Sequence, residues 1–349
     1  MKGWIINPEA DTVDLLTTYG RFLEDDYRMA IDSLQIPDTF EEYIEKSNRR
    51  FLIIGSKEAP GLIAKSVYLC LKLAGPDSVA VKTNMIDESI MVQNVFKNHA
   101  GDVETKLFVT NSDELLLDSV WRDTIEEATD IIVFGNENSM ETFRDYEQVG
   151  RRVWEHGSKF SFGIVRAEHL TPLLINSICF DFFSYYGEGF LAPKFYFIVG
   201  NLRKKVAQQF SHNMQAFYGE FIEQYRNKLP FTRQSDLVQE VINANYIGKY
   251  LRLEDLNSDA IFDTLYGDIR LVLVDDLDEV SDFIDKWNDN ISTVAINLDD
   301  DLDSLDLLED KQVMRICPVG DMQFPDFFEQ YNTVDDFNIY DNSDDDTDF

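Results

Sequence analysis

The sequence lacks the long apolar run that a membrane-spanning helix requires. No stretch reaches the roughly 18 to 20 apolar residues of such a helix. The N-terminus, MKGWIINPEADTVD, carries one lysine and soon becomes acidic, which does not fit a secretory signal. Cysteine is scarce, and Cys70, Cys179 and Cys317 form an odd, widely spaced set without a CxxC pair. We therefore expect reduced thiols and a cytoplasmic protein without a membrane span.

Several patterns that mark catalytic or ligand-binding sites are also missing. The sequence has no HExxH motif and no cluster of histidines and cysteines, so we expect no metal site. It has neither GxGxxG after an apolar run nor GxxxxGK[ST], the two standard phosphate-binding fingerprints. The GxSxG motif of serine hydrolases is absent as well. The sequence therefore gives no standard motif for nucleotide binding or hydrolysis.

Basic residues are few, with 31 lysines and arginines against 65 aspartates and glutamates. The formal net charge is −34 and the sequence pI is near 4.3, which disfavours binding to nucleic-acid phosphates. Residues 275–349 hold 24 acidic and three basic side chains, so 21 of the net negative charges lie there. Three interpretations stay open for this acidic region: a solvated face with a frayed tail, adaptation to high salt, or binding to a basic partner.

Apolar runs of two lengths alternate along the first half of the chain. With 349 residues, 44% hydrophobic and 13% aromatic, the chain can form a packed core in two lobes. Short apolar runs predict strands at 51–55, 78–82, 106–110 and 130–135. Longer periodic patterns between and after them predict helices at 60–74, 85–98, 113–129 and 139–149. This alternation predicts an α/β fold with a parallel sheet covered by helices.

A second α/β region begins near residue 164. An apolar helix leads to the stretch DFFSYYGEGFLAPKFY at 181–196, where Gly187 and Gly189 end the helix and a strand follows Pro193. Further strands are expected at 270–274 and 292–297, and further helices at 202–227, 235–244 and 277–287. We predict one lobe over 1–163 with a leading helical segment (1–48), a second over 164–312, a returning element over 313–330, and a disordered acidic tail over 331–349.

Four residues at the ends of predicted strands are candidates for binding a cofactor. Gly55 precedes a helix whose N-terminus could hold a phosphate, and Lys82 ends the second strand. Gly135 and Asn136 end the fourth strand, and ligands of open α/β sheets bind at this edge. Each residue also has an ordinary explanation in turn geometry or solvent exposure. His156 has the same two interpretations, a contact to a cofactor phosphate or a surface histidine.

Five segments, in order over roughly residues 50–330, resemble a known family. They are VAVKTN, VFGNENSMETF, HGSKFSFGIV, YYGEGF and RICPVGDMQFPDFF. Together they are similar to bacterial acyl-CoA reductases of the LuxC type, which are distant members of the aldehyde dehydrogenase superfamily. The resemblance implies an aldehyde-dehydrogenase-like fold of two α/β lobes and a cofactor-binding role for Lys82 and Gly135. It also implies NADP(H) as cofactor and an acyl-CoA or acyl-carrier thioester as substrate.

The resemblance also implies a catalytic cysteine directly after the second glycine of YYGEGF, and Phe190 stands there. A thiolate must attack the thioester before hydride transfer releases an aldehyde, and a phenyl ring cannot do so. Cys179 lies eleven residues before Phe190 in an apolar helix, and we expect it to be a core residue. We expect the same of Cys70. Cys317 is not expected to be catalytic either. Glu188 could act as a base, but nothing in the sequence supplies an acid partner.

Two classes of function remain open. The first is a degenerate reductase that still binds a nucleotide or an acyl ligand with little or no turnover. The second is a non-enzymatic structural or interaction protein that reuses the scaffold and binds a basic partner through its acidic surface. A homo-oligomer is compatible with either class. A cofactor site with open geometry at Lys82 and Gly135 favours the first, and a site filled by side chains favours the second.

Overall fold

The computed structural model describes most of the chain from Arg49 to Gln323. The described residues are 28, 49–55, 60–74, 78–109, 119–135, 137–157, 159–187, 191–202, 204, 207–208, 210–216, 219, 249–257, 261, 269–298, 301–309, 311 and 313–323. The expected leading segment (apart from Arg28), the helix at 235–244 and the acidic tail lie outside them. Apart from Arg28, which belongs with the second unit, the described residues divide into two compact units, one ending at His156 and the other beginning at Gly157. The expected lobe boundary after residue 163 falls inside a strand of the second unit.

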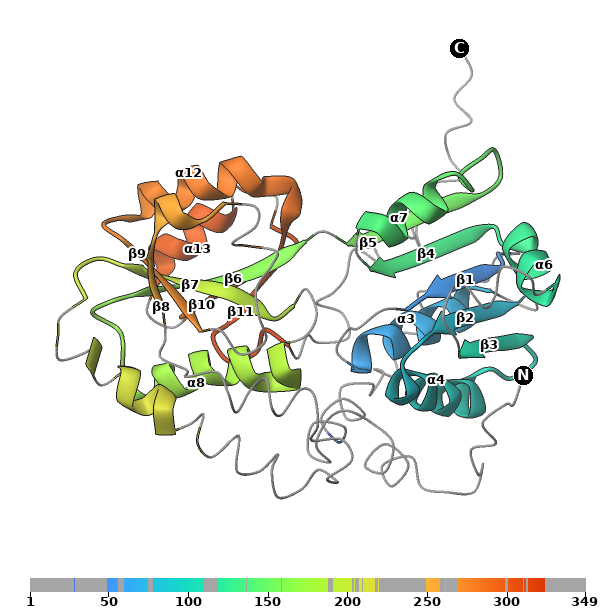
Figure 1. Cartoon of the computed structure of the whole chain (residues 1–349), viewed down its shortest axis with the longest axis horizontal. Coiled ribbons are helices and arrows are strands. Elements are labelled where there is room, and N and C mark those ends of the chain that lie inside the picture. Colours follow the sequence, from blue (N-terminus) through green and yellow to red (C-terminus); the bar gives the residue numbers. More distant parts are fainter. Residues whose placement is uncertain are drawn as a thin grey trace, which may run out of the picture. The chain divides into compact units, whose positions relative to one another are not determined.

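The first unit is built on a five-stranded sheet with the strand order β3-β2-β1-β4-β5 (Figure 1). Strand β1 pairs in parallel with β2 and β4, and β2 with β3, as the alternation of strands and helices predicts. The strands are β1 (Phe51–Ile54), β2 (Val79–Thr83), β3 (Thr105–Val109), β4 (Asp130–Gly135) and β5 (Arg152–Gly157). The helices are α3 (Pro60–Leu73), α4 (Ile86–His99), α6 (Ser119–Glu127) and α7 (Glu137–Arg144).

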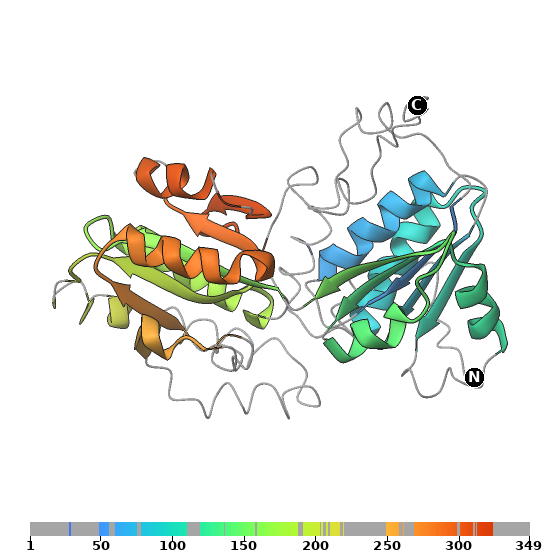
Figure 2. The same ribbon diagram turned by 90° about the horizontal axis from the view of Figure 1, so that it is seen from above.

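Helices cover both faces of this sheet (Figure 2). Figure 2 shows α3 and α4 on one face and α6 and α7 on the other. Helices α6 and α7 pack against the sheet through Trp121 and Ile125 of α6 and Met140 and Phe143 of α7. All four residues of β1 are buried, because a parallel strand covered on both faces has no solvent side.

The sequence pattern overestimates the last helix of this unit. A helix was expected over 139–149, but α7 ends at Arg144 and the chain then turns. Gly150 has φ +85°, and Gln148 forms an isolated bridge with Arg151. The chain therefore reverses before β5, a strand that the sequence analysis did not predict. Its half-buried, polar sequence RVWEHG carries little apolar signal.

The second unit contains a six-stranded sheet in which all five strand pairs are parallel. The strand order is β11-β10-β6-β7-β9-β8. The strands are β6 (Phe160–Arg166), β7 (Pro193–Val199), β8 (Lys249–Arg252), β9 (Arg270–Val274), β10 (Ile291–Ile296) and β11 (Arg315–Pro318). The helices described from end to end are α8 (Pro172–Phe183), α12 (Leu277–Trp287) and α13 (Leu302–Glu309), and 3-10 turns lie at Ser184–Gly187, Leu253–Asp255 and Asn288–Asn290. Residues 210–216 are also helical.

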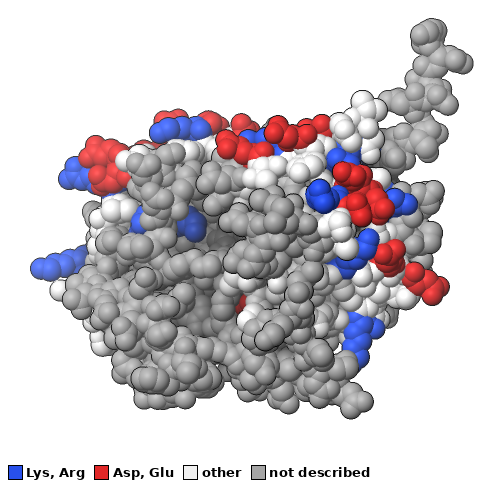
Figure 3. All heavy atoms as spheres, turned by 45° about the vertical axis from the view of Figure 1, so that its right-hand side comes forward, with Lys and Arg blue, Asp and Glu red and all other residues white. Residues whose placement is uncertain are grey.

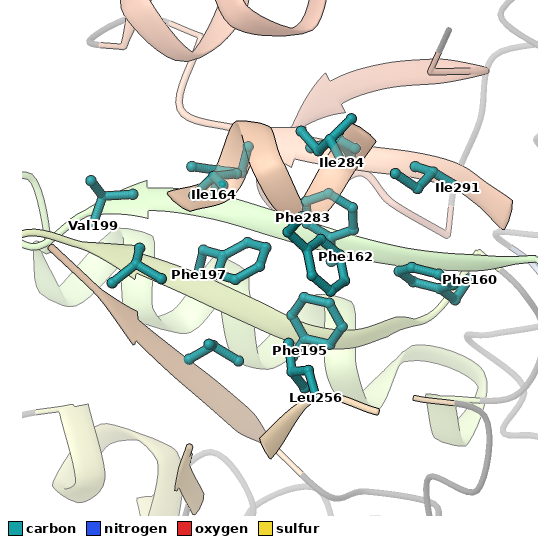
Figure 4. Close-up of a cluster of buried hydrophobic side chains, with 14 of the residues drawn as sticks. Phe160, Phe162, Ile164, Phe195, Phe197, Val199, Leu256, Phe283, Ile284 and Ile291 are labelled. Atoms are coloured by element: carbon teal, nitrogen blue, oxygen red, sulfur yellow. The ribbon is translucent and has the colours of Figure 1, made fainter. Parts of the chain in front are cut away.

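Alternate residues of the central strands supply two separate cores. Figure 1 places α12 and α13 on one face of the six-stranded sheet and α8 on the other. On the α12 face, Phe162, Phe195 and Phe197 surround Phe283 of α12, with ring centroids 5.3 to 5.8 Å apart (Figure 4). On the α8 face lies Tyr196, one residue on from Phe195. This period of two follows from strand geometry and orients Tyr196 toward α8.

No helix within the described ranges combines the length and apolarity needed to cross a membrane.

Candidate functional site

Three of the expected cofactor-binding residues lie at the carboxyl edge of the five-stranded sheet. Gly55 directly follows β1, Lys82 lies near the end of β2, and Gly135 ends β4. These are adjacent strands, since Ile54 of β1 is in register with Lys82 on one side and with Val133 on the other. The Gly55 N–H donates to the Lys82 carbonyl oxygen at 2.8 Å. The structure therefore brings the three residues to one edge, while Asn136 lies outside the described residues.

A buried carboxylate shares this edge with Lys82. Glu88, in the first turn of α4, is 2% exposed, and Lys82 is 7% exposed. Burial lowers the pKa of the Lys82 ammonium from its usual range, and the nearby Glu88 carboxylate partly opposes that shift. A Cβ atom at Gly55 would lie 2.5 Å from Glu88 Oε2, so a larger residue there would require the Glu88 side chain to shift.

The residues at this edge differ in how well they suit a nicotinamide dinucleotide. The Lys82 ammonium is a donor suited to ribose hydroxyls or a phosphate. Glu88 Oε2 lies 2.5 Å from the Cβ position of Gly55, and a carboxylate this close disfavours a phosphate beside Gly55 because two anions repel each other. Of the expected residues, Lys82 has the donor chemistry that a dinucleotide needs, whereas the Glu88 carboxylate beside Gly55 disfavours a phosphate there.

His156 lies on β5 with its ring stacked on Phe134 of β4. The ring centroids are 4.8 Å apart and the ring planes differ by 17°. Phe134 immediately precedes Gly135, so the imidazole is held near the edge that carries the cofactor candidates. Its half-buried position is compatible with both interpretations given to this residue, a contact to a cofactor phosphate and a surface histidine.

A network of hydrogen bonds surrounds Asp181 at the end of α8. The carboxyl group is 1% exposed, and its Oδ2 accepts from the Tyr196 hydroxyl at 2.5 Å and from the Gly320 N–H at 2.7 Å. Its Oδ1 accepts from the Met322 N–H at 3.0 Å. Burial raises the pKa of Asp181 to about 7, although these three donors favour the ionised form.

The returning segment after β11 contacts the same helix end through its own side chain. Gln323 Nε2 donates to the carbonyl oxygen of Asp181 at 3.1 Å and also to that of Ser184. Arg315 holds the segment in place, because its guanidinium donates to the carbonyl oxygens of Asp321 and Met322 at 3.0 and 2.9 Å. The segment RICPVGDMQFPDFF, one of the five that carry the family resemblance, thus binds the helix that leads to the glycine turn through Gln323.

The chain leaves α8 through a 3-10 turn that ends at Gly187. This glycine has φ +68°, a left-handed conformation that side chains disfavour. Its Cβ position lies only 2.9 Å from the Phe182 carbonyl oxygen, which adds a steric reason for glycine. Glu188, Gly189 and Phe190 follow directly and lie outside the described residues.

The three cysteines are buried in the cores of the two units. Burial raises the pKa of the Cys179 thiol to about 12 and that of Cys70 well above its usual range. A thiol is nucleophilic mainly as its thiolate, which these surroundings disfavour. The positions of Cys70 and Cys179 agree with their interpretation as core residues.

Sequence reasoning missed Asp181, Tyr196 and Glu88. A signal was present for Asp181, because it is the one charged residue in the apolar stretch LLINSICFDFF. Glu88 gave no such signal, since it follows an aspartate in the first turn of a mixed helix. Gln323 was inside a quoted segment but had no assigned role.

Comparisons with known proteins bear on both units. Residues 86–332 match the acyl-CoA reductase (LuxC) family, whereas no curated protein sequence matches. Propionaldehyde dehydrogenase from Rhodopseudomonas palustris, solved with bound CoA and an acylated cysteine, is 12% identical with a TM-score of 0.52, covering 88% of this chain and 81% of its own. An acetylating aldehyde dehydrogenase from Geobacillus thermoglucosidasius is 10% identical with a TM-score of 0.56, covering 89% and 78%.

An engineered glycolyl-CoA reductase with bound NADP+ is also similar, at 10% identity and a TM-score of 0.53, covering 88% of this chain and 80% of its own. These likenesses confirm the α/β, aldehyde-dehydrogenase-like fold with its two parallel sheets. The family match spans well over half of the chain. It begins at α4, four residues after Lys82, and contains α8 and the returning segment. The chain therefore belongs to the LuxC acyl-CoA reductase family.

Proposed function

We propose that this protein is an acyl-CoA reductase-like protein that retains a nicotinamide-cofactor site at Lys82 and has lost most or all turnover. The observation that carries the proposal is the sequence YYGEGF, in which Phe190 follows the second glycine. Membership of the LuxC family supports the reductase-like part. The arrangement of Lys82 and Gly135 at one sheet edge supports the cofactor site.

The chemistry of an active reductase explains why Phe190 matters. A cysteine thiolate attacks the thioester carbonyl, the carbon–sulfur bond to CoA breaks, and CoA leaves as a thiol after taking up a proton. A reduced nicotinamide supplies the hydride that releases the acyl group as an aldehyde. Phe190 offers no lone pair for the first step. The buried thiols of Cys179 and Cys317 do not replace it, because both lie in the core around Tyr196.

The residues of this chain divide the proposed binding task. Lys82 would donate hydrogen bonds to the dinucleotide, and Gly135 would let it approach the end of β4. Glu88 would limit affinity for the phosphorylated cofactor, because its carboxylate lies beside Lys82 at the same edge. We therefore propose NADP(H) with reduced affinity, and an acyl-CoA or acyl-carrier thioester as the other ligand.

The alternative is a non-enzymatic protein that uses the scaffold to bind a basic partner. Two observations favour it. Asp275, Asp278 and Asp282 are exposed at successive turns along α12 and the residues just before it. Figure 3 shows both acidic and basic side chains among the described residues of the face that it draws. The Glu88 carboxylate against Gly55 also agrees with a cofactor site that is partly filled.

Thermal unfolding with and without ligands separates the two proposals. The wild-type protein and Lys82→Met would be heated with NADPH, NADP+ or a medium-chain acyl-CoA at millimolar concentration. A ligand at about 100 times its Kd adds about 2.7 kcal/mol to the free energy of unfolding. A rise in melting temperature with NADPH that Lys82→Met abolishes supports the cofactor site. No rise with any of the three ligands contradicts the first proposal and supports the alternative.

A further inference from the structure

Helix α8 and the returning segment bind each other reciprocally. The side chain of Asp181 accepts from the backbone N–H groups of Gly320 and Met322. In return, the side chain of Gln323 donates to backbone carbonyls of residues 181 and 184. Each partner therefore satisfies backbone groups of the other with a side chain. We call Asp181, Tyr196 and Gly320–Gln323 the clasp.

We propose that Asp181 and Gln323 are positioning residues, which fix the end of α8 and so determine where the chain that carries residue 190 begins. This inference rests on one part of the proposed function, the assignment of residue 190 to the nucleophile position of the family. Neither residue is proposed to contact a substrate. The clasp acts through the backbone of Ser184–Gly187.

The location of the clasp supports this role. The carbonyl groups at a helix end lack intrahelical partners, and an amide side chain from elsewhere can satisfy them. Gln323 satisfies two such groups, at Asp181 and Ser184. Ser184 also caps the helix, as its N–H donates to the Phe180 carbonyl oxygen. These hydrogen bonds join the end of α8 to residues that are 139 to 142 positions away in the sequence. The bonded residue nearest the glycine turn, Ser184, lies three residues before Gly187.

Burial makes these bonds costly to lose. Asp181 is 1% exposed and Gln323 is 3% exposed, so water cannot easily replace a missing partner. The charged and titratable groups around the Asp181 carboxyl are Tyr196 from β7, Asp321 from the returning segment, Arg315 from β11, and the thiols of Cys179 and Cys317 near Tyr196. Arg315 donates to backbone carbonyls of the segment, so it supports the clasp from outside.

Hydrogen exchange on the full chain tests the positioning role directly. Asp181→Asn and Gln323→Met remove one half of the clasp each, and Tyr196→Phe is a milder change that removes only the hydroxyl donor. The matched control is Asp301→Asn in the same unit. Asp301 is 2% exposed and also accepts three hydrogen bonds, from Arg166 Nε, Ser304 N–H and Ser304 Oγ, but none involves α8.

We expect exchange of the amides of 182–187, Gly320 and Met322 to become about tenfold faster in Asp181→Asn and Gln323→Met, as for the loss of one buried hydrogen bond. Tyr196→Phe should give a smaller change at the same amides. Asp301→Asn should leave them unchanged, even if its melting temperature falls as much. Unchanged exchange at 182–187 in both clasp variants, or an equal rise in Asp301→Asn, would overturn the proposal.

A second readout links the clasp to residue 190. In Phe190→Cys, the introduced thiol would be treated with octanoyl-CoA and the acylated protein measured by mass. Adding Asp181→Asn should slow acylation at least tenfold, whereas adding Asp301→Asn should not. Equal acylation rates in the two double variants would contradict positioning. If Phe190→Cys is not acylated at all, the proposed thioester site is wrong, and the exchange rates alone decide whether the clasp fixes the helix end.

Discussion

Gly163 of β6 lies directly against the ring of Tyr196 on β7. The two residues are register partners, and a Cβ atom at Gly163 would come within 1.9 Å of Tyr196 Cε1. No side chain can share that space, so the glycine at 163 allows the tyrosine to lie flat across β6. The phenol then reaches Asp181 on the helix that covers this face of the sheet.

Gly163→Ala should therefore be strongly destabilising. Overpacking of a core costs about 1 to 3 kcal/mol. An added methyl group at residue 163 could be accommodated only if the backbone of β6 or the buried ring of Tyr196 shifted. We expect a loss of at least about 2 kcal/mol in the free energy of unfolding, measured by urea denaturation. Gly219→Ala is the control, because in the described part of the chain nothing beyond its own helix lies within 4 Å of its Cβ position. A Gly163→Ala protein as stable as this control would show that the contact is absent.

Glu88→Gln should strengthen NADPH binding if the cofactor site is retained. The amide fits the same space against Gly55 but removes a negative charge beside Lys82, which should tighten binding of the anionic cofactor about tenfold. Isothermal titration at low ionic strength would measure the change. Glu104→Gln removes one negative charge from an exposed position in the same unit and controls for net charge. Equal affinities in the two variants would argue against a phosphate near Lys82.

The stability of the protein should depend on pH through Asp181. Its folded pKa of about 7 lies above the unfolded value near 3.9. The folded state thus binds the proton more tightly, and this stabilisation is complete below about pH 4 and lost as the pH rises through about 7. The full effect is on the order of 4 kcal/mol.

Urea unfolding of the wild type and Asp181→Asn at pH 5, 6, 7 and 8 isolates this contribution. The free energy of unfolding of the wild type, relative to the variant, should fall as the pH rises from 5 to 8. Other carboxylates affect both proteins alike and cancel in the difference. A constant difference would show that Asp181 is ionised throughout this range, and one that grows with pH would show that its folded pKa lies below the unfolded value.

Phe190→Cys should form an acyl-enzyme with a medium-chain acyl-CoA if the thioester site survives. The new thiol would stand at the position that the family resemblance gives to the nucleophile. Mass spectrometry of the intact protein would detect the added acyl group. Phe190→Ser and the wild type are the controls, and both should stay unmodified because the native cysteines are buried. Acylation of the wild type would instead identify a native thiol as reactive.

Much of the fold could be predicted because it depends on local apolar patterns. The bounds of β4, β9 and α12 agree with the sequence analysis to the residue. Strands buried on both faces produce short apolar runs, and these runs are separable from the longer helical patterns between them. Strand β5 carries no such run, and it was missed for that reason.

The sequence by itself determined the α/β class, the parallel sheets and the absence of a cysteine at residue 190, since each depends on residue type or short-range order. Only the tertiary structure decided which groups meet. Asp181 and Gly320 are 139 residues apart, and Glu88 reaches Gly55 only because α4 follows the strand beside β1. Contacts of this kind depend on strand order and on the faces that helices cover, which a periodic pattern in one segment does not contain.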